Sequence, residues 1–384
     1  MTNLYPGFTP PQVTLAKKLG GISWVLVLLI CETAGFGFAV LYSAADGSMQ
    51  PWAATQMIRF TVALTLMIGA ALLGTRFWFQ GAYWVYGVAL ALIVAVDLRG
   101  FIGMGARRWI DLGIVQLQPS QMMNVVLVLA LARYFHGLSN DDVARVRFLI
   151  PPAFMVLIPA GLVLKQPDLG TAVMLVLTGA ALFFVAGVRL RIFALMTGAI
   201  AAALPVGWHF LRNYQRNRIY TFLDPESDPL GAGYHILQSK IALGSGGLFG
   251  KGFLNGSQSH LSFLPEKHTD FIFTTLAEEF GFAGGLTLLA LYALIMAYGL
   301  AIALRCRNQF GRLLVLGVTT NFSLYVFINT AMVMGLIPVV GVPLPLISYG
   351  GTAMLAVMFG LGLLLSVGVH RDARLGRSGE PRAG

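Results

Sequence analysis

Two carboxylates in one short stretch, LPEKHTDFIFTTLAEE, have the type and spacing for acid–base or ligand chemistry. Asp270 stands immediately before an apolar helical pattern, and Glu266 precedes it by about one helical turn. A carboxylate at the start of such a run could accept a proton from a bound hydroxyl, and the nearby charge of Glu266 would make it a stronger base. The spacing equally fits Asp270 as a helix N-cap. A reactive role and a structural role both stay open.

The stretch closes a polar island, residues 211–270, in a chain that is otherwise almost continuously apolar. The island holds 6 Lys or Arg and 5 Asp or Glu. Residues 214–240 show a basic start, a Pro and Gly turn at 228–231, and the pattern of a short amphipathic helix. Residues 241–256 are rich in glycine, which indicates a loop with close backbone approach and only weakly a phosphate site. We therefore expect the chemistry in this island.

The composition is that of a membrane protein. Hydrophobic residues make up 57% and charged residues 11%, whereas soluble domains have about 25% charged residues, and the mean hydropathy is +0.76. Because about 20 apolar residues cross a bilayer, we expect an all-α integral membrane protein with about ten spans, at residues 19–43, 55–75, 77–97, 119–136, 148–164, 170–188, 192–210, 280–304, 309–336 and 349–369. The island is then a long extracytoplasmic loop between spans 7 and 8. No cleavage site follows the first run, so it is expected to remain as a membrane helix.

The basic residues predict the orientation. Those in most short loops and near both ends fall on one side, which should be cytoplasmic: Lys17, Lys18, Arg76, Arg145, Arg147, Arg189, Arg191, Arg305, Arg307, Arg312 and the arginines of the tail. This explains the net charge of +10 without a nucleic-acid partner. Residues 1–370 should form one membrane domain, and 371–384 a short basic cytoplasmic tail. Arg99, Arg107 and Arg108 violate the pattern in the outside loop 98–118, where an anionic ligand is one explanation.

Polar residues inside the apolar runs are costly to bury and need partners. Glu32 and Arg59 lie at depths that allow an ion pair between the first two spans. Gln121 and Asn124 are three residues apart, share one helix face, and should form interhelical hydrogen bonds. Asp168, in KQPDLG, fits either a helix cap or a role in an outer cavity.

Long motifs over nearly the whole chain resemble those of the SEDS family (shape, elongation, division and sporulation). They are, in order, RRWIDLG at 107–113, QPS at 118–120, QPDLGTA at 166–172, DPESDPLGAGYHILQSKIALGSGGLFGKG at 224–252, FLPEKHTDFIF at 263–273 and PLISYGG at 345–351. So many long motifs in the family's order are highly specific. Within the family, the wording WIDLG and NGSQSHLSFLPEKHTDF resembles the cell-elongation members more than the cell-division members.

The resemblance implies a ten-span protein of the bacterial cytoplasmic (inner) membrane with both termini in the cytoplasm. It implies a peptidoglycan glycosyltransferase that polymerises lipid II outside that membrane and releases undecaprenyl pyrophosphate. It also implies a class B penicillin-binding protein, the transpeptidase, and other elongation-complex proteins as partners. Asp270 matches the family's essential acidic residue, with the role of general base or of metal or substrate ligand, and Trp109 matches a position sensitive to substitution.

The reaction would place negative charge on the leaving pyrophosphate, which cations or a metal must stabilise. The expected substrate-binding residues are Trp109, Arg108, Lys165, Arg218, Lys240, Glu266, Gln121 and Asn124. A divalent cation, Mg²⁺ or Mn²⁺, held by Asp270 and the pyrophosphate is an alternative, although no ligand set is visible. The family commonly has a glutamate and a lysine where this chain has Gln121 and Asn124. A hydrogen bond between neutral amides could replace that ion pair without leaving a lone buried charge.

Two other functions fit parts of the sequence. A lipid II flippase or other transporter would use the buried polar residues as a pathway, although no paired broken helices mark an inverted repeat. A non-enzymatic scaffold would only position the penicillin-binding protein. If the chain is a flippase, substitution of Asp270 should change its transport activity little. If it is a scaffold, only substitutions that weaken partner binding should change the phenotype.

Overall fold

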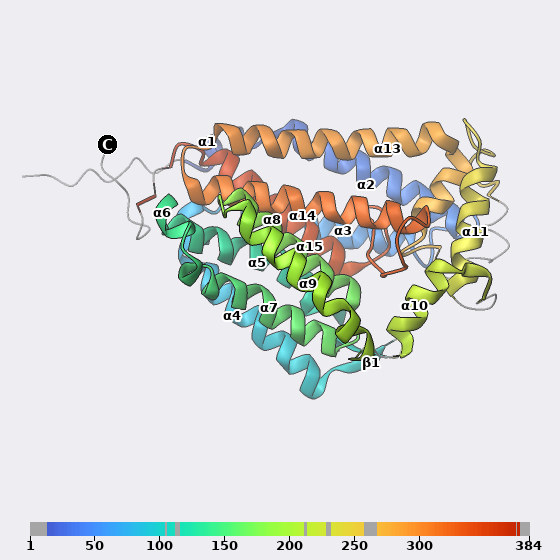
Figure 1. Cartoon of the computed structure of the whole chain (residues 1–384). Coiled ribbons are helices and arrows are strands. Elements are labelled where there is room, and N and C mark those ends of the chain that lie inside the picture. The colour runs from blue at the N-terminus through green and yellow to red at the C-terminus, as the bar shows by residue number, and fades with distance from the viewer. Residues whose placement is uncertain are drawn as a thin grey trace, which may run out of the picture.

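The computed structural model describes residues 14–103, 106–111, 116–210, 213–227, 232–256, 267–373 and 375–376. Its elements in chain order are α1 (Leu15–Gly20), α2 (Trp24–Ala44), α3 (Ala53–Leu72), α4 (Thr75–Arg99), β1 (Phe101–Gly103), β2 (Ala106–Asp111), β3 (Gln116–Leu117), α5 (Pro119–His136), α6 (Asn140–Val143), η1 (Val146–Phe148), α7 (Ile150–Lys165), α8 (Leu169–Val185), α9 (Leu190–Phe210), α10 (Asn213–Leu223), η2 (Pro225–Ser227), α11 (Ala232–Ser245), α13 (Ile272–Arg305), α14 (Gln309–Val333) and α15 (Gly351–Val369). Figure 1 shows the long helices as one bundle, with α1 and α6 near one end and α10 and α11 at the other.

Helices lie at all of the predicted spans, which confirms the all-α fold. Within the described ranges, seven helices are long and apolar enough to cross a membrane, namely α2, α3, α4, the η1–α7 segment, α13, α14 and α15. Two shorter apolar helices, Leu169–Val185 and Leu190–Ala203, correspond to the sixth and seventh predicted spans. The remaining predicted span is α5, so the count of ten is approximate.

Helix α5 lies at the centre of the bundle. It contacts α4, α7, α8, α14 and α15, and every residue from Val125 to Ala132 is buried. A helix that is apolar on all sides is suited to such a position, because each of its faces meets another helix. The same enclosure means that Gln121 and Asn124, both on α5, need partners inside the protein.

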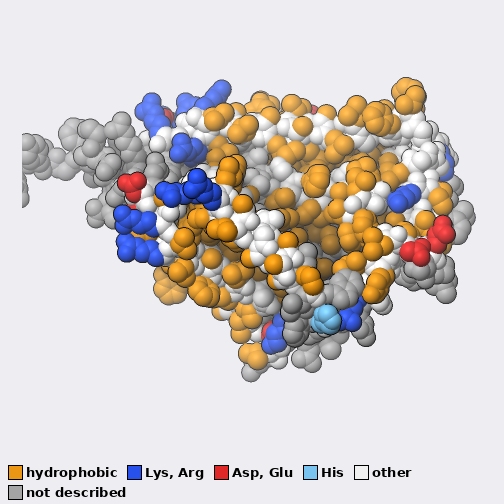
Figure 2. Space-filling model, in the orientation of Figure 1, with side chains coloured by type: hydrophobic (Ala, Val, Ile, Leu, Met, Phe, Trp, Pro, Cys, Tyr) orange, Lys and Arg blue, Asp and Glu red, His pale blue; other side chains and the backbone are white. Residues whose placement is uncertain are grey.

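The two ends of the bundle differ in charge. Figure 2 shows Lys and Arg side chains gathered at the end that carries α1 and α6. The opposite end carries α10, α11 and the connection between α14 and α15, residues 334–350, which we call loop 334–350. The bundle therefore has a basic end and, opposite it, the end formed by the island.

The expected outside loop 98–118 contains a small antiparallel sheet of order β1-β2-β3. Phe101 pairs with Trp109 and Ile102 with Arg107, and Ile110 pairs with Leu117. Cross-strand pairing fixes the backbone of β2, which carries Arg108 and Trp109. Sequence reasoning missed this sheet because β1 and β3 have only three and two residues, and β2, ARRWID, does not alternate apolar and polar residues.

The glycine-rich segment packs into a break in α13. At Gly281 the backbone of α13 leaves the helix, with φ 66° and ψ −163°. Backbone groups that lose their helical partners at this break bond to the glycine-rich segment instead. Lys251 N donates to Glu278 O at 3.0 Å, and Phe282 N donates to Gly247 O at 2.9 Å. A Cβ on Gly250 would lie 2.0 Å from Glu279 O. The predicted close backbone approach is confirmed, and here it is to the protein's own helix.

An ion pair joins the same two segments. Lys251 Nζ lies 2.7 Å from Glu278 Oε1, and the Glu278 side chain is 0% exposed whereas that of Lys251 is 29% exposed. The neighbouring Glu279 accepts a hydrogen bond from Ser43 on α2. These contacts fix the first turns of α13 to both the island and α2.

Replacing Lys251 by methionine should therefore lower the free energy of unfolding by about 3 kcal/mol, because a buried carboxylate loses its ion-pair partner. The double variant Lys251→Met/Glu278→Met should be close to neutral, since it removes both charges. Denaturation in detergent micelles measures both. Equal losses in the single and double variants would contradict an ion-pair origin.

The expected pair between Glu32 and Arg59 does not form, although both residues are described. Glu32 is exposed on α2, and the Arg59 guanidinium lies over the Tyr349 ring, 4.5 Å from its centroid. Sequence depth alone does not determine which helix faces point toward each other. Arg59 consequently belongs to the neighbourhood of loop 334–350.

Candidate active site

Asp270 lies in the turn of residues 267–271, just before α13, and its side chain is half-buried. The backbone carbonyls of Asp270 and of the two residues before it each accept a hydrogen bond. Tyr349 N donates to His268 O at 2.9 Å, Ser348 Oγ donates to Thr269 O at 2.7 Å, and Asn329 Nδ2 donates to Asp270 O at 2.8 Å. The backbone that carries the carboxylate is therefore fixed from α14 and loop 334–350.

The carboxylate itself faces loop 334–350. A Cβ on Gly341 would lie 3.4 Å from Asp270 Oδ2, and Gly341 has φ +72°. The N-cap position of α13 is Phe271, with no side-chain cap hydrogen bond. Phe271 therefore occupies the N-cap position of this helix, and Asp270 precedes it by one residue.

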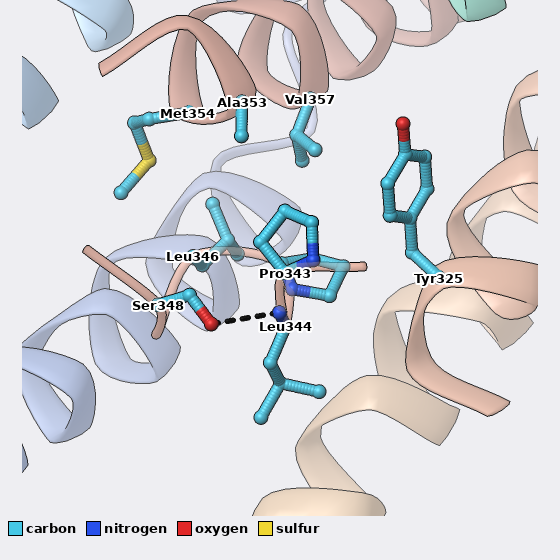
Figure 3. Close-up of a pocket in the computed structure, with 9 residues that line it drawn as sticks. Tyr325, Pro343, Leu344, Leu346, Ser348, Ala353, Met354 and Val357 are labelled. Atoms are coloured by element: carbon cyan, nitrogen blue, oxygen red, sulfur yellow. Dashed lines mark hydrogen bonds between the residues drawn. The ribbon is translucent and has the colours of Figure 1, made fainter. Parts of the chain in front are cut away.

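Loop 334–350 is itself held in place. Ser348 Oγ accepts from Leu344 N at 2.8 Å, Gln56 Nε2 donates to Ser348 O at 3.0 Å, and Tyr292 Oη donates to Pro345 O at 2.6 Å. Ser348 and Leu344 help to line a cavity of about 10 Å³, and Figure 3 shows the hydrogen bond between them. That volume fits about one water molecule and no sugar. The cavity is part of the loop's packing, and a substrate must lie outside it.

An aromatic and basic cluster adjoins the Asp270 turn. The rings of Trp52 and His268 stack with centroids 4.3 Å apart and an interplanar angle of 7°, and Tyr349 lies 5.8 Å from His268. Lys267 Nζ is 5.9 Å from the Trp52 centroid. With Arg59 over Tyr349, aromatic faces and two cations adjoin the turn that carries Asp270, a combination suited to sugars and phosphates.

Three of the expected substrate-binding residues lie near the small sheet. Arg108 on β2 donates from Nε to Gln166 O at 3.1 Å and also bonds to Pro167 O. Lys165 forms an ion pair with Asp97 at 3.3 Å, although its side chain is 70% exposed. Trp109 is partly buried opposite Phe101. Arg108 therefore ties β2 to the connection between α7 and α8, while the Lys165 ammonium also faces solvent.

Two further expected cations come from the island. Lys240 on α11 is exposed, and a Cβ on Gly335 of loop 334–350 would lie 2.3 Å from its Cε. The preceding Ser239 is buried and donates to Val333 O at 2.7 Å, which holds α11 against the end of α14. Arg218 lies on α10, partly buried. Lys240 and Asp270 thus both adjoin loop 334–350, at Gly335 and Gly341 respectively. Glu266 lies outside the described residues.

Gln121 and Asn124 meet at one partner on α14. Tyr325 Oη donates to Gln121 Oε1 at 2.9 Å and accepts from Asn124 Nδ2 at 3.0 Å. The expected interhelical hydrogen bonds are confirmed, and they pass through Tyr325. Asp168 accepts from Thr171 N at 3.2 Å and so caps α8, as one of its two readings predicted.

Replacing Tyr325 by phenylalanine should lower the free energy of unfolding by about 1–3 kcal/mol, because two buried amides lose a partner. Tyr298→Phe is a matched control, since Tyr298 has no side-chain hydrogen bond in the described part of the chain, and its effect should stay within about 0.5 kcal/mol. Thermal unfolding in detergent compares the two. Equal stability of both variants would show that the amides do not depend on Tyr325.

The residues that the structure describes contain no group of three or more His, Cys, Asp or Glu able to hold a metal ion. The alternative of a Mg²⁺ or Mn²⁺ ion would need only the Asp270 carboxylate from the protein, because the pyrophosphate oxygens would supply the other ligands.

Sequence reasoning missed Asn329, Ser348 and Trp52, which hold or flank the Asp270 turn. Asn329 carried a usable signal, because an amide within an apolar run needs a partner, and in the structure its side chain is 0% exposed. Ser348 and Trp52 carried none, since a serine in a proline-rich loop and a tryptophan at a span end are common.

Comparison with known proteins agrees with this architecture. A family model described as "Cell cycle protein" (FtsW, RodA, SpoVE) matches residues 23–373. The chain is 43% identical over 356 residues to peptidoglycan glycosyltransferase MrdB of Escherichia coli K12, covering 90% of this chain and 93% of that protein. It is 32% identical over 365 residues to stage V sporulation protein E of Bacillus subtilis 168, covering 92% and 98%.

Solved structures give the same result. The rod shape determining protein RodA of Thermus thermophilus matches with a TM-score of 0.69 and 32% identity, covering 91% of this chain and 97% of that chain. A chain from a peptidoglycan synthase complex, described as coordinating polymerization and crosslinking, matches with a TM-score of 0.77 and 36% identity, covering 91% and 98%.

The apolar helices define a multi-pass membrane protein, and the Asp270 turn places a polar candidate site at one end of its bundle. The chain belongs to the FtsW/RodA/SpoVE family, the SEDS family that its motifs resemble.

Proposed function

We propose that this chain polymerises lipid II into glycan strands on the outer face of the bacterial cytoplasmic membrane during cell elongation, with Asp270 as general base. It is a peptidoglycan glycosyltransferase, as its relative MrdB is named. The observation that carries the assignment of Asp270 is its half-buried carboxylate on a backbone fixed by three hydrogen bonds. A base must be held in place to accept a proton efficiently.

In the proposed reaction the 4-hydroxyl of the acceptor's N-acetylglucosamine attacks the anomeric carbon of the donor's N-acetylmuramic acid. A new carbon–oxygen bond forms, the bond to the pyrophosphate breaks, and undecaprenyl pyrophosphate leaves with the bonding electron pair. The hydroxyl proton passes to the Asp270 carboxylate. Transfer to a positioned carboxylate accelerates such a step by about 100-fold to 10,000-fold.

The leaving pyrophosphate needs positive charge as it departs. Lys240 is the favoured cation, because its side chain is exposed and lies across loop 334–350, which also adjoins Asp270. Lys267 in the Asp270 turn and Arg218 on α10 are the next candidates. Arg108 is engaged with two carbonyls, so its proposed role is to position β2 and Trp109 rather than to meet the phosphate.

The proposed orientation puts both termini and the basic end in the cytoplasm, and the island and Asp270 outside. The proposed partner is a class B penicillin-binding protein, because a similar chain occurs in a peptidoglycan synthase complex. Other elongation-complex proteins complete the assembly. A transpeptidase bound at the outer face would crosslink the strands that this chain makes.

The test is polymerisation of labelled lipid II by the purified protein, alone and with a class B penicillin-binding protein. Long glycan strands with the partner present are expected. A parallel assay follows lipid II translocation across vesicles that contain the same protein. Translocation of lipid II without strand formation would show that the chain is a flippase and not a polymerase. If the protein shows neither activity but still binds the partner, the scaffold function is supported.

A further inference from the structure

A groove of about 460 Å³ lies at the basic end of the bundle, far from the Asp270 turn along the helices. It is bounded by Gly21 and Ser23 before α2, by the C-terminal half of α13, and by the end of α15. This volume falls in the range of small-molecule sites, roughly 300–1,000 Å³. Nothing in the proposed reaction uses it.

The groove is about one membrane leaflet deep. Its lining on α13 runs from Leu294 to Arg305, and eleven residue steps at 1.5 Å each span about 16 Å. The hydrocarbon core of a bilayer is about 30 Å thick. The α13 wall therefore reaches from the helix end to about the middle of the membrane, which is the depth occupied by one acyl chain.

The walls and the mouth differ in chemistry. The walls are largely apolar, with Leu294, Ala297, Ile302 and Leu365 among them. Arg305 is the last residue of α13 and Arg371 follows α15, so both arginines stand at the membrane surface. An apolar slot that ends at guanidinium groups matches a molecule with a long apolar chain and an anionic head.

The charge at the mouth is available for a ligand. Arg305 is exposed and has no ion-pair or hydrogen-bond partner within the described part of the chain. Arg371 is 3.7 Å from Asp372, but both side chains are more than half exposed, and exposed pairs contribute little. Arg307 shares the same Asp372 at 3.6 Å. Three arginines against one aspartate leave a net charge of +2 at this mouth.

A second groove of the bundle provides an internal comparison. The groove between α7, α8 and α9 has a volume of about 290 Å³ and is lined by apolar residues and glycine alone, with no charged side chain. It offers nothing to select a head group. The pairing of a leaflet-deep slot with two arginines thus distinguishes the groove between α13, α15 and the connection before α2.

We propose that this groove binds one anionic phospholipid of the leaflet at the basic end, with its phosphate on Arg305 and Arg371 and one acyl chain along α13. Arginine binds phosphate through paired hydrogen bonds, and basic pockets between membrane helices select anionic head groups. In the proposed orientation this is the cytoplasmic leaflet. The lipid contacts the connection before α2 and the ends of α13 and α15 that are remote from Asp270, so the site is distinct from the substrate site.

The experiment is native mass spectrometry of the purified full chain titrated with phosphatidylglycerol, phosphatidylcholine or inorganic phosphate. The variant Arg305→Gln/Arg371→Gln removes the charge, and Ala301→Phe fills the slot without changing charge. Arg189→Gln/Arg191→Gln is the matched control, because it removes two exposed arginines from the same end, outside this groove. Monodisperse elution and unchanged thermal unfolding verify that each variant folds.

Wild type and the control should retain one phosphatidylglycerol in preference to phosphatidylcholine, and inorganic phosphate should not displace it. The charge variant should bind phosphatidylglycerol about 30-fold more weakly, as expected for two arginines, and Ala301→Phe should lose the retained lipid. Equal binding of the two lipids by wild type overturns the proposal without any variant. Full binding by Ala301→Phe, or equal losses in the charge variant and the control, overturns it as well. Because this assay contains no lipid II, its outcome is independent of the polymerase test.

Discussion

Asp270→Asn should lower lipid II polymerisation by about 100-fold to 10,000-fold, because the amide keeps the shape of the side chain but cannot accept the acceptor's proton. The backbone hydrogen bonds of the Asp270 turn come from Tyr349, Ser348 and Asn329 to carbonyls, so the substitution leaves them in place. The measurement is strand synthesis from labelled lipid II with saturating penicillin-binding partner. Folding and partner binding are checked on the same sample.

Glu226→Gln is the matched control, since Glu226 is an exposed acid of η2 in the same island. It should polymerise at the wild-type rate. The two roles of Asp270 separate in a titration with Mn²⁺. A general base predicts no recovery of the asparagine variant at any metal concentration, whereas a metal ligand predicts partial recovery. Wild-type activity in Asp270→Asn would show that Asp270 is not the general base, and the base would then have to be another residue of the island.

Gly281→Ala should lower the free energy of unfolding by about 2–6 kcal/mol, the sum of a strained backbone and a steric clash. Gly281 has φ 66° and ψ −163°, a region that only glycine adopts readily. A Cβ there would lie 2.3 Å from Gly250 N and 2.7 Å from Leu248 O. Both contacts are backbone, so no side chain can move aside. Unfolding in detergent micelles measures the loss.

Gly285→Ala is the control one helical turn further along α13. A Cβ at Gly285 would meet only Phe273 at 3.5 Å, an ordinary contact. Alanine is the better helix former by about 0.5–1 kcal/mol, so this variant should be as stable as wild type or slightly more so. Similar losses in both variants would show that α13 is not specially constrained at Gly281.

The sequence by itself determined the class of fold and the position of the candidate carboxylate. Apolar runs placed helices at all the expected spans, because hydropathy is a property of each segment alone. The motifs around Asp270 and in loop 334–350 indicated the family, which the match over residues 23–373 confirms. Asp270 itself could be singled out because a carboxylate before an apolar run is locally visible. Its catalytic role remains a prediction.

Only the tertiary structure decided which distant residues meet. Asn329 reaches the Asp270 carbonyl from 59 positions away, and Tyr325 joins Gln121 from 204 positions away. Likewise, Arg59 faces Tyr349 rather than Glu32, and the glycine-rich segment fills a break in α13 that no glycine count foretold. The physical reason is that periodicity and hydropathy report which face of a helix is buried. They do not report which neighbour covers it, because partner choice depends on the packing of all the helices together.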